Sequence, residues 1–485
     1  MKSFYMVCAA LALTGCAAIN KPLNQPLPEG QNPPLAEVTM TAPTDGEVYV
    51  GLAFSGGGMR ASAFAYGLLE ELRAQTATPK DPDGVLSEVR LVTGVSGGSV
   101  TAAYFGLKGP AALDGYRENY LLTNAEKYMA NSPLNPLTLV RGVTGGANGR
   151  KTFGRYLDEK LFHGATFGDL RQRSNIITWI NATDMANQTP FLFSPETFDA
   201  LCSDLGSFPI SDAVAASAAF PLVFSPITLE AHQGKCQYKE PDWLTDARYN
   251  PEATSAMRAQ AAALESYGDP EKVQYVKLLD GGITDNFGTT GLAIERARAR
   301  NGFAPMTPQQ AVRLKRFLFI VADAGTEKTY AWSRKLGGPG GVKLAMGIAG
   351  ASMGSASRTG YDAMRLQLDR WQKDLVDYRC SLSRGEVARL RGSLSGWNCR
   401  DVKFFVGKIS FDGLDPAQQA QLNEIPTRLK LKPEQVDMTI EAGRQAARVN
   451  PELNGFLHAQ PGRNPLAALK TGTGKQPKRI SPIKN

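Results

Sequence analysis

The chain is organised around Val92-Thr93-Gly94-Val95-Ser96-Gly97-Gly98-Ser99. Strand-forming residues precede this stretch, and helix-compatible residues 100–107 follow it. Gly-x-Ser-x-Gly between a strand and a helix is typical of a nucleophile elbow, a tight turn that exposes a serine hydroxyl. Side chains in place of the glycines would collide with neighbouring backbone. The pattern also arises by chance in chains with many glycines, and this one has 49, so an ordinary strand–helix turn is the alternative.

A second glycine-rich turn lies earlier, in Ser55-Gly56-Gly57-Gly58-Met59-Arg60. It joins a predicted buried strand over residues 46–54 to a predicted helix over 61–74. Three consecutive glycines leave several N–H groups free to converge on one oxygen, which suits an oxyanion hole or a phosphate cradle. A phosphate loop needs a lysine that this turn lacks, and the dinucleotide fingerprint Gly-x-Gly-x-x-Gly is also absent from it. We therefore expect an oxyanion hole beside Ser96.

An acidic residue ends a third informative stretch. Residues 276–279 predict a strand, and Asp280-Gly281-Gly282 follows at its carboxyl end, where ligands bind in α/β folds. The chain has only 3 histidines, and none suits the place after the acid that a Ser-His-Asp triad requires. A Ser–Asp dyad needs no histidine. In such a dyad Asp280 would take the Ser96 proton directly, and partial burial would raise the pKa of its carboxyl group.

Other segments complete an alternation of strands and helices. Buried strands are predicted over residues 175–184, 191–194, 316–325 and 402–411, and helices over 210–220, 361–376 and 433–442. Residues 342–357 are rich in Gly, Ala and Met, with Gly350 and Gly354 four positions apart. This spacing favours a closely packed helix crossing, and a lipid-facing or lid element is the alternative.

The amino terminus predicts export. Residues 1–15 combine a basic start with an apolar run too short to span a bilayer, as in a secretory signal peptide. Leu13-Thr14-Gly15-Cys16 resembles a bacterial lipobox, which implies cleavage before Cys16, lipidation of that residue and, because Ala17 follows, sorting to the outer membrane. An ordinary secreted protein with an incidental cysteine is the alternative. The proline-rich residues 16–45 predict an extended tether.

Charge and cysteine content narrow the class of protein. The net charge is +8, but the tail after Gly462 holds six basic and no acidic residues, so the body is almost neutral and shows no nucleic-acid footprint. We expect residues 459–485 to be a solvated, disordered tail. Four cysteines remain outside the amino terminus, and nearness along the chain favours the disulfides Cys202–Cys236 and Cys380–Cys399. A zinc site is the rival, but its ligand spacing is absent from the sequence.

The three glycine-rich motifs, together with Ala215-Ala216-Ser217-Ala218-Ala219-Phe220-Pro221, occur in the order seen in patatin-like phospholipases, and the chain resembles that family over residues 48–325. The resemblance implies a three-layer α/β/α domain with a mainly parallel central sheet, acyl-lipid hydrolysis, and no metal or other cofactor. It also implies Ser96 as nucleophile, Asp280 as base, and Gly56, Gly57, Gly58 and Arg60 around the oxyanion. Gly288 stands where many members carry proline.

The sequence therefore predicts a lipid-anchored acyl hydrolase. Its domain would cover residues 46–458, with a motif-bearing core over 48–325 and a C-terminal extension over 326–458. The expected substrate is a phospholipid or related acyl lipid, and the expected location is the bacterial outer membrane. Two alternatives stay open: a general carboxylesterase or thioesterase that acts on soluble compounds, and a catalytically silent lipid-binding lipoprotein.

Overall fold

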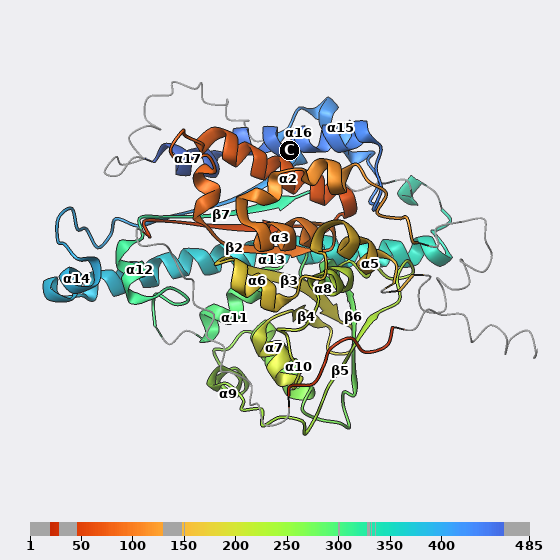
Figure 1. Ribbon diagram of the computed structural model, residues 1–485, viewed down its shortest axis with the longest axis horizontal. Helices are drawn as coiled ribbons and strands as arrows, with labels where there is room; N and C mark the ends of the chain where they lie inside the picture. Colours follow the sequence, from red (N-terminus) through yellow and green to blue (C-terminus); the bar gives the residue numbers. More distant parts are fainter. Residues whose placement is uncertain are drawn as a thin grey trace, which may run out of the picture.

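The computed structural model describes residues 20–28, 46–129, 148–149, 151–298, 301–326, 330, 332–334 and 336–459 (Figure 1). The predicted signal peptide, the lipidation site Cys16 and the basic tail beyond residue 459 lie outside the described residues.

One eight-stranded sheet forms the centre of the molecule, with the order β5-β6-β3-β2-β1-β7-β8 and with β4 paired to β3. The parallel strands are β1 (Val48–Phe54), β2 (Val89–Val95), β3 (Ile177–Asp184), β7 (Arg316–Asp323) and β8 (Lys403–Ser410). The antiparallel additions are β4 (Thr189–Leu192), β5 (Ile227–Glu230) and β6 (Tyr275–Asp280). β1 and β2 are apolar and buried along almost their whole length, as expected for central parallel strands covered on both faces.

Helices cover both faces of the sheet, so the predicted three-layer α/β/α class with a mainly parallel sheet is confirmed. One face carries α2 (Gly58–Thr76), α3 (Gly97–Lys108) and α16 (Pro433–Val449), and Figure 1 shows α16 beside α2. The other face is covered by part of the long helix α13 (Gly341–Ser381). Its Trp371 meets the rings of Phe317 and Phe404 edge-on, with ring centroids 5.4 and 5.3 Å apart.

The remaining helices lie around these layers. They are α5 (Phe153–Leu157), α6 (Phe167–Arg173), α7 (Pro195–Ala200), α8 (Ile210–Ser217), α9 (Asp242–Tyr249), α10 (Ser255–Ser266), α11 (Thr290–Arg298), α12 (Pro308–Arg313), α14 (Arg384–Arg391), α15 (Pro416–Asn423) and α17 (Pro451–His458). Among the described helices, none combines the length and the hydropathy of a membrane span.

The predicted close helix crossing is found elsewhere than expected. Gly350 has open space around its Cα, and Gly354 is near only the flexible end of the Arg358 side chain, so the expectation of close packing there is wrong. Close packing occurs instead between α2 and α16. A Cβ added to Gly67 of α2 would lie 2.1 Å from the carbonyl oxygen of Ile440 in α16. A Cβ added to Gly443 of α16 would lie 2.3 Å from the carbonyl oxygen of Phe64 in α2.

Residues 20–28 bind the body, which differs from the free tether expected there. Pro26 forms a β-bridge with Ser203, and the Leu27 N–H donates to the Cys202 carbonyl oxygen at 2.9 Å. The Asn24 side chain donates to the Glu230 carbonyl oxygen at 2.7 Å. The nine residues thus lie along β5 and the loop after α7 (Figure 1).

Two disulfides fix loops of the chain, the second by joining a loop to the last turn of α13. Cys202 is bonded to Cys236, with their Cα atoms 5.5 Å apart, and Cys380 to Cys399, with their Cα atoms 4.9 Å apart. These are the two pairs that nearness along the chain favours. The first lies next to the bound residues 20–28, because Leu27 bonds to Cys202 itself.

The α2–α16 crossing generates a stability prediction. We expect Gly443→Ala to lower the free energy of unfolding by about 1–3 kcal/mol, because the new methyl group has no space between the two backbones. Gly350→Ala is the matched control in an exposed helix and should be neutral or stabilising by up to about 1 kcal/mol. Urea unfolding of both variants measures the difference, and equal effects would contradict the packing described here.

Candidate active site

Ser96 occupies the turn between β2 and α3 in a strained conformation. Its φ is 51° and its ψ is −123°, values that residues other than glycine rarely adopt. Surrounding bonds hold it there: the Ser96 N–H donates to the Ser217 hydroxyl at 2.9 Å, and that hydroxyl donates to the Asn181 carbonyl oxygen at 2.6 Å. The Ser99 hydroxyl donates to the Ser96 carbonyl oxygen at 2.6 Å. The predicted elbow geometry is therefore present.

The glycine loop between β1 and α2 touches this elbow directly. An added Cβ on Gly97 would lie 2.0 Å from the Gly58 carbonyl oxygen, so the two backbones can approach this closely only without a side chain. The Gly56 N–H donates to Asn286 Oδ1 at 3.2 Å. Within the described part of the chain, the N–H groups of Gly57 and Gly58 have no hydrogen-bond partner. Of the three glycines, these two offer free donors beside Ser96.

Arg60 binds protein groups on two other segments. Its guanidinium donates to the carbonyl oxygens of Ala324 and Ile425 and to the Thr427 hydroxyl, and the side chain is buried. Burial lowers the pKa of Arg60 to about 10, an effect partly opposed by the nearby Asp323 carboxylate. These bonds use three of its five N–H donors, and Nη2 lies 3.6 Å from the place where a Cβ on Gly57 would stand, so the expected place of Arg60 around the oxyanion stays a prediction. It positions the glycine loop against β7 and residues 425–427.

Asp280 ends β6, on the far side of β3 from Ser96. Val95 pairs with Asn181 and Asp280 with Ala182, so adjacent residues of β3 bring the elbow and the acid together. The carboxyl group is buried, and burial raises its pKa to about 6. Hydrogen bonds from the Ser96 side chain and the Gly282 N–H, the latter at 2.9 Å, partly oppose this rise. A carboxyl group of this kind can hold or release a proton near neutral pH.

Asn286 links the site to α13. Its Oδ1 accepts from Gly56, and its Nδ2 donates to the Ser357 hydroxyl at 2.9 Å. Neither Asn286 nor Ser217 is predicted as a site residue from the sequence. Both lie in stretches that resemble the family, Ser217 in the alanine-rich motif before Pro221 and Asn286 after the Asp-Gly-Gly stretch, but that resemblance assigned them no role.

The structure also explains why glycine replaces proline at residue 288. Gly288 has a φ of +66°, whereas a proline ring holds φ near −65°. An added Cβ would lie 2.3 Å from Asn181 Nδ2 and 2.5 Å from Thr93 Oγ1. Glycine is therefore required at residue 288 by the conformation of the loop after Asp280, where the backbone lies against the side chains of Asn181 and Thr93.

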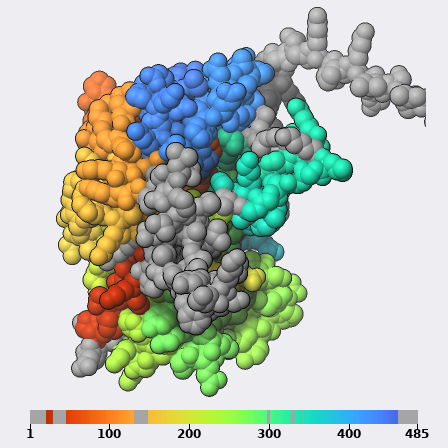
Figure 2. Space-filling view, turned by 90° about the vertical axis from the view of Figure 1, so that its right-hand side faces the viewer, coloured from red at the N-terminus to blue at the C-terminus, as the bar shows by residue number. Residues whose placement is uncertain are grey.

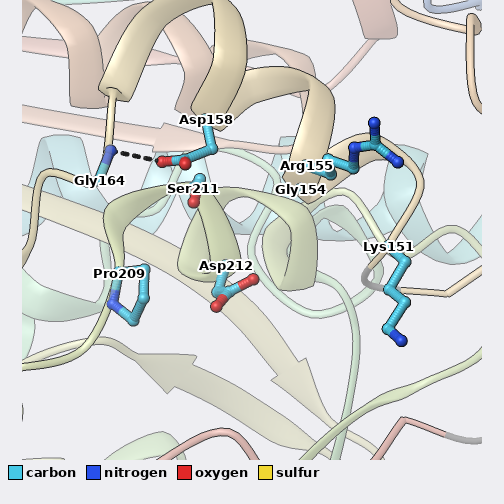
Figure 3. A pocket seen from close by; sticks show the side chains of 8 residues that line it. All are labelled: Lys151, Gly154, Arg155, Asp158, Gly164, Pro209, Ser211 and Asp212. Atoms are coloured by element: carbon cyan, nitrogen blue, oxygen red, sulfur yellow. Dashed lines mark hydrogen bonds between the residues drawn. The ribbon is translucent and has the colours of Figure 1, made fainter.

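Other polar features lie apart from Ser96. A pocket of about 280 Å³ is lined by Lys151, Gly154, Arg155, Asp158, Gly164, Pro209, Ser211 and Asp212 (Figure 3). It opens at the first turn of α8, whereas Ser217, the partner of Ser96, ends that helix. Eight helical residues separate the two ends by roughly 12 Å. In the described residues, no group of three or more His, Cys, Asp or Glu side chains could hold a metal ion.

The family model described as Patatin-like phospholipase matches residues 52–293, about half of the chain. The chain belongs to the patatin-like phospholipase family. The matched residues carry the glycine loop, the elbow, Ser217, Asp280 and Asn286, so the strained serine and the buried acid lie inside the family domain. No curated protein sequence matches the chain.

Solved structures with a similar chain course include human GIVD cytosolic phospholipase A2, at 12% identity and a TM-score of 0.40. The similarity covers 86% of this chain and 60% of the human one, so this chain spans about three fifths of that enzyme's length. VipD from Legionella pneumophila is similar at 13% identity and a TM-score of 0.27, over 90% of this chain and 73% of VipD. Such TM-scores assign no substrate to this chain.

The burial of Asp280 predicts a pH-dependent cost in stability. The folded chain binds this proton up to pH 6 or so, whereas an unfolded aspartate releases it near 3.8. Between these values the native state holds more protons, so the contribution of Asp280 to stability falls as pH rises. Asp280→Asn removes the charge and should raise the free energy of unfolding by up to roughly 3 kcal/mol above pH 6, with little effect near pH 4. Urea unfolding between pH 4 and 8 tests this, and a gain independent of pH would contradict it.

Proposed function

We propose that this protein hydrolyses acyl esters of membrane phospholipids or related lipids through a dyad of Ser96 and Asp280. The observation that carries the proposal is that adjacent residues of β3 bring the strained Ser96 turn and the buried Asp280 together, and that burial raises the pKa of this carboxyl group to about 6. A nucleophile and a base in contact supply the geometry of covalent acyl transfer. Family membership supports a lipid substrate.

The reaction follows from the positions of these groups. Ser96 Oγ attacks the ester carbonyl carbon while Asp280 accepts the hydroxyl proton. The free N–H groups of Gly57 and Gly58 stabilise the oxyanion that forms, and one such donor contributes about 3 kcal/mol in the measured case of subtilisin. Asp280 then returns the proton to the leaving alcohol. Water, activated by the same carboxylate, releases the fatty acid from Ser96.

The two alternatives make different experimental predictions. A general esterase or thioesterase should act equally well on monomeric and aggregated substrate, whereas a phospholipase should gain rate when its substrate forms an interface. A silent lipid-binding protein should not react with a serine-directed fluorophosphonate. The free glycine N–H groups and the polarised Ser96 favour an active site over a silent one.

We also propose that the protein is held at the bacterial outer membrane by acyl chains on Cys16. The lipobox-like residues 13–16 support this, and several acyl chains on one residue anchor stably. Asn20, which donates to the Pro226 carbonyl oxygen at 2.9 Å, is only four residues later, a reach of about 14 Å. The bound residues 20–28 would therefore keep the catalytic body close to its anchor.

Two substitutions test the dyad. Ser96→Ala and Asp280→Asn should each lower fatty-acid release from mixed phospholipid vesicles by at least about a thousandfold, because the attacking atom or its base is lost. Ser207→Ala and Asp412→Asn make the same chemical changes at exposed positions and should keep activity. Fatty-acid release that persists in a folded Ser96→Ala protein would refute the assignment.

The raised pKa of Asp280 predicts the pH profile. The base must be ionised, so kcat/KM should rise about tenfold per pH unit below pH 6 and level off above it. A monomeric short-chain ester is the suitable substrate, because binding to a lipid surface then has no influence. An acid limb centred near pH 4 would show that the base is not this buried carboxylate.

A further inference from the structure

Exposed apolar side chains gather at one end of the molecule. Six of the eleven large hydrophobic residues exposed in the described chain lie between residues 330 and 348. We call these six the apolar patch: Tyr330, Trp332, Leu336, Leu344, Met346 and Ile348. Leu336 is fully exposed and Ile348 is 64% exposed. Figure 2 shows the teal residues near 340 projecting from the surface.

The exposure has a structural cause in α13. The second half of this helix packs on the sheet through Met364, Leu368, Trp371 and Leu375, which recur at helical spacing and are almost completely buried. Over residues 341–360, by contrast, all described side chains are exposed or half-exposed. The helix is thus secured at one end, while the other end presents apolar residues to the surroundings. Exposed apolar patches of this kind mark surfaces that bind another apolar surface.

The charge around the patch identifies that surface. Residues 330–361 contain four basic residues and no acidic one. Arg334 and Lys343 are exposed beside the apolar side chains. Basic and apolar residues together match an anionic lipid surface, which attracts the charges and takes up the apolar groups. A second copy of the chain fits less well, because two such patches would repel each other.

The same helix reaches the catalytic residues. The Ser352 hydroxyl donates to the Ile283 carbonyl oxygen at 2.8 Å, directly after the Asp-Gly-Gly stretch. A Cβ added to Gly56 would lie 3.6 Å from the Met353 methyl group and 3.4 Å from Ser96 Cβ. Met353 and Ser96 therefore lie close to each other beside the glycine loop. Met346, Gly350 and Met353 share one helix face, and the space at Gly350 is open. An apolar row therefore leads from the patch to Ser96.

We propose that the apolar patch docks on an anionic phospholipid bilayer, and that the Met346–Met353 face of α13 guides an acyl chain from the bilayer to Ser96. In Figure 2 residues 20–28, drawn in red, lie at the lower left and the teal residues near 340 at the upper right of the view. The guidance of an acyl chain rests on the proposed function, whereas docking does not.

Docking is tested with the full chain carrying Ser96→Ala, which removes turnover. The probe is a vesicle of phosphatidylglycerol and dibrominated phosphatidylcholine, because bromine quenches only tryptophan that enters the bilayer. We expect quenching that disappears in Trp332→Phe and remains in Trp397→Phe, a half-exposed tryptophan outside the patch. Absence of binding, or quenching that does not depend on Trp332, would overturn the proposal. Burial of Trp332 that depends on protein concentration without vesicles would assign the patch to a second copy instead.

Guidance is tested in the active chain. Met346→Asp with Gly350→Asp, both on the guiding face, should lower hydrolysis of anionic vesicles at least tenfold and leave hydrolysis of a monomeric short-chain ester, whose acyl chain is too short to use that face, within twofold. Leu366→Asp with Val449→Asp adds the same charge at two other exposed apolar positions and should change neither rate. Equal losses in both pairs would overturn the proposal. If no ester is hydrolysed but Trp332 is quenched, the proposed function fails while docking stands.

Discussion

The contact between two backbone turns is the constraint on which the rest of this structure depends. The Gly58 carbonyl oxygen meets Gly97 so closely that no side chain fits between them. These turns follow β1 and β2, neighbouring parallel strands in which Phe54 pairs with Gly94, so the sheet itself brings the two turns to one place. Ser96 and the free N–H groups are therefore positioned by turns at the ends of two central strands of the sheet.

The C-terminal extension completes this arrangement. The match to the family model ends at residue 293, yet Arg60 binds Ile425 and Thr427, and the Met59 N–H donates to the Arg428 carbonyl oxygen at 2.8 Å. Gly56 is held by Asn286, which in turn binds α13. The glycine loop thus depends on contacts from residues far along the chain. Substitutions in the C-terminal extension should therefore alter the geometry of the glycine loop, although the substituted residues do not contact substrate.

The proposed function and stability oppose each other at Asp280. A carboxyl group that is nearly excluded from water destabilises the fold when it ionises, but the same burial gives it a pKa suited to proton transfer. The strained φ of Ser96 is a similar cost, tolerated because Ser217, Ser99 and the close packing of glycines hold the turn. Stability that the sheet and its two helical layers provide offsets both costs.

The sequence by itself determined the elements whose signals are local. Apolar runs bounded by glycine turns predicted β1, β2, β3, β6 and β7, and the spacing around Ser96 and Asp280 predicted the turns that carry them, because the conformation of such turns depends on the glycines themselves. Glycine spacing could not separate an open helix from a packed one. Gly350 and Gly354 suggested a crossing, while Gly67 and Gly443 make one, and only the neighbouring helix decides the difference.

The tertiary structure alone decided the partners of Arg60, the binding of residues 20–28 and the exposure of the first half of α13. Each depends on a surface assembled from distant segments: Arg60 meets residues some 365 positions away, and Asn20 meets residues more than 200 positions away. The local sequence pattern does not predict such partners, because each contact depends on the shape and polarity of the distant segment that it meets. The local sequence of the glycine turns determines which side chains are available for reaction. Tertiary contacts between distant segments determine how those side chains are positioned and which surfaces are exposed.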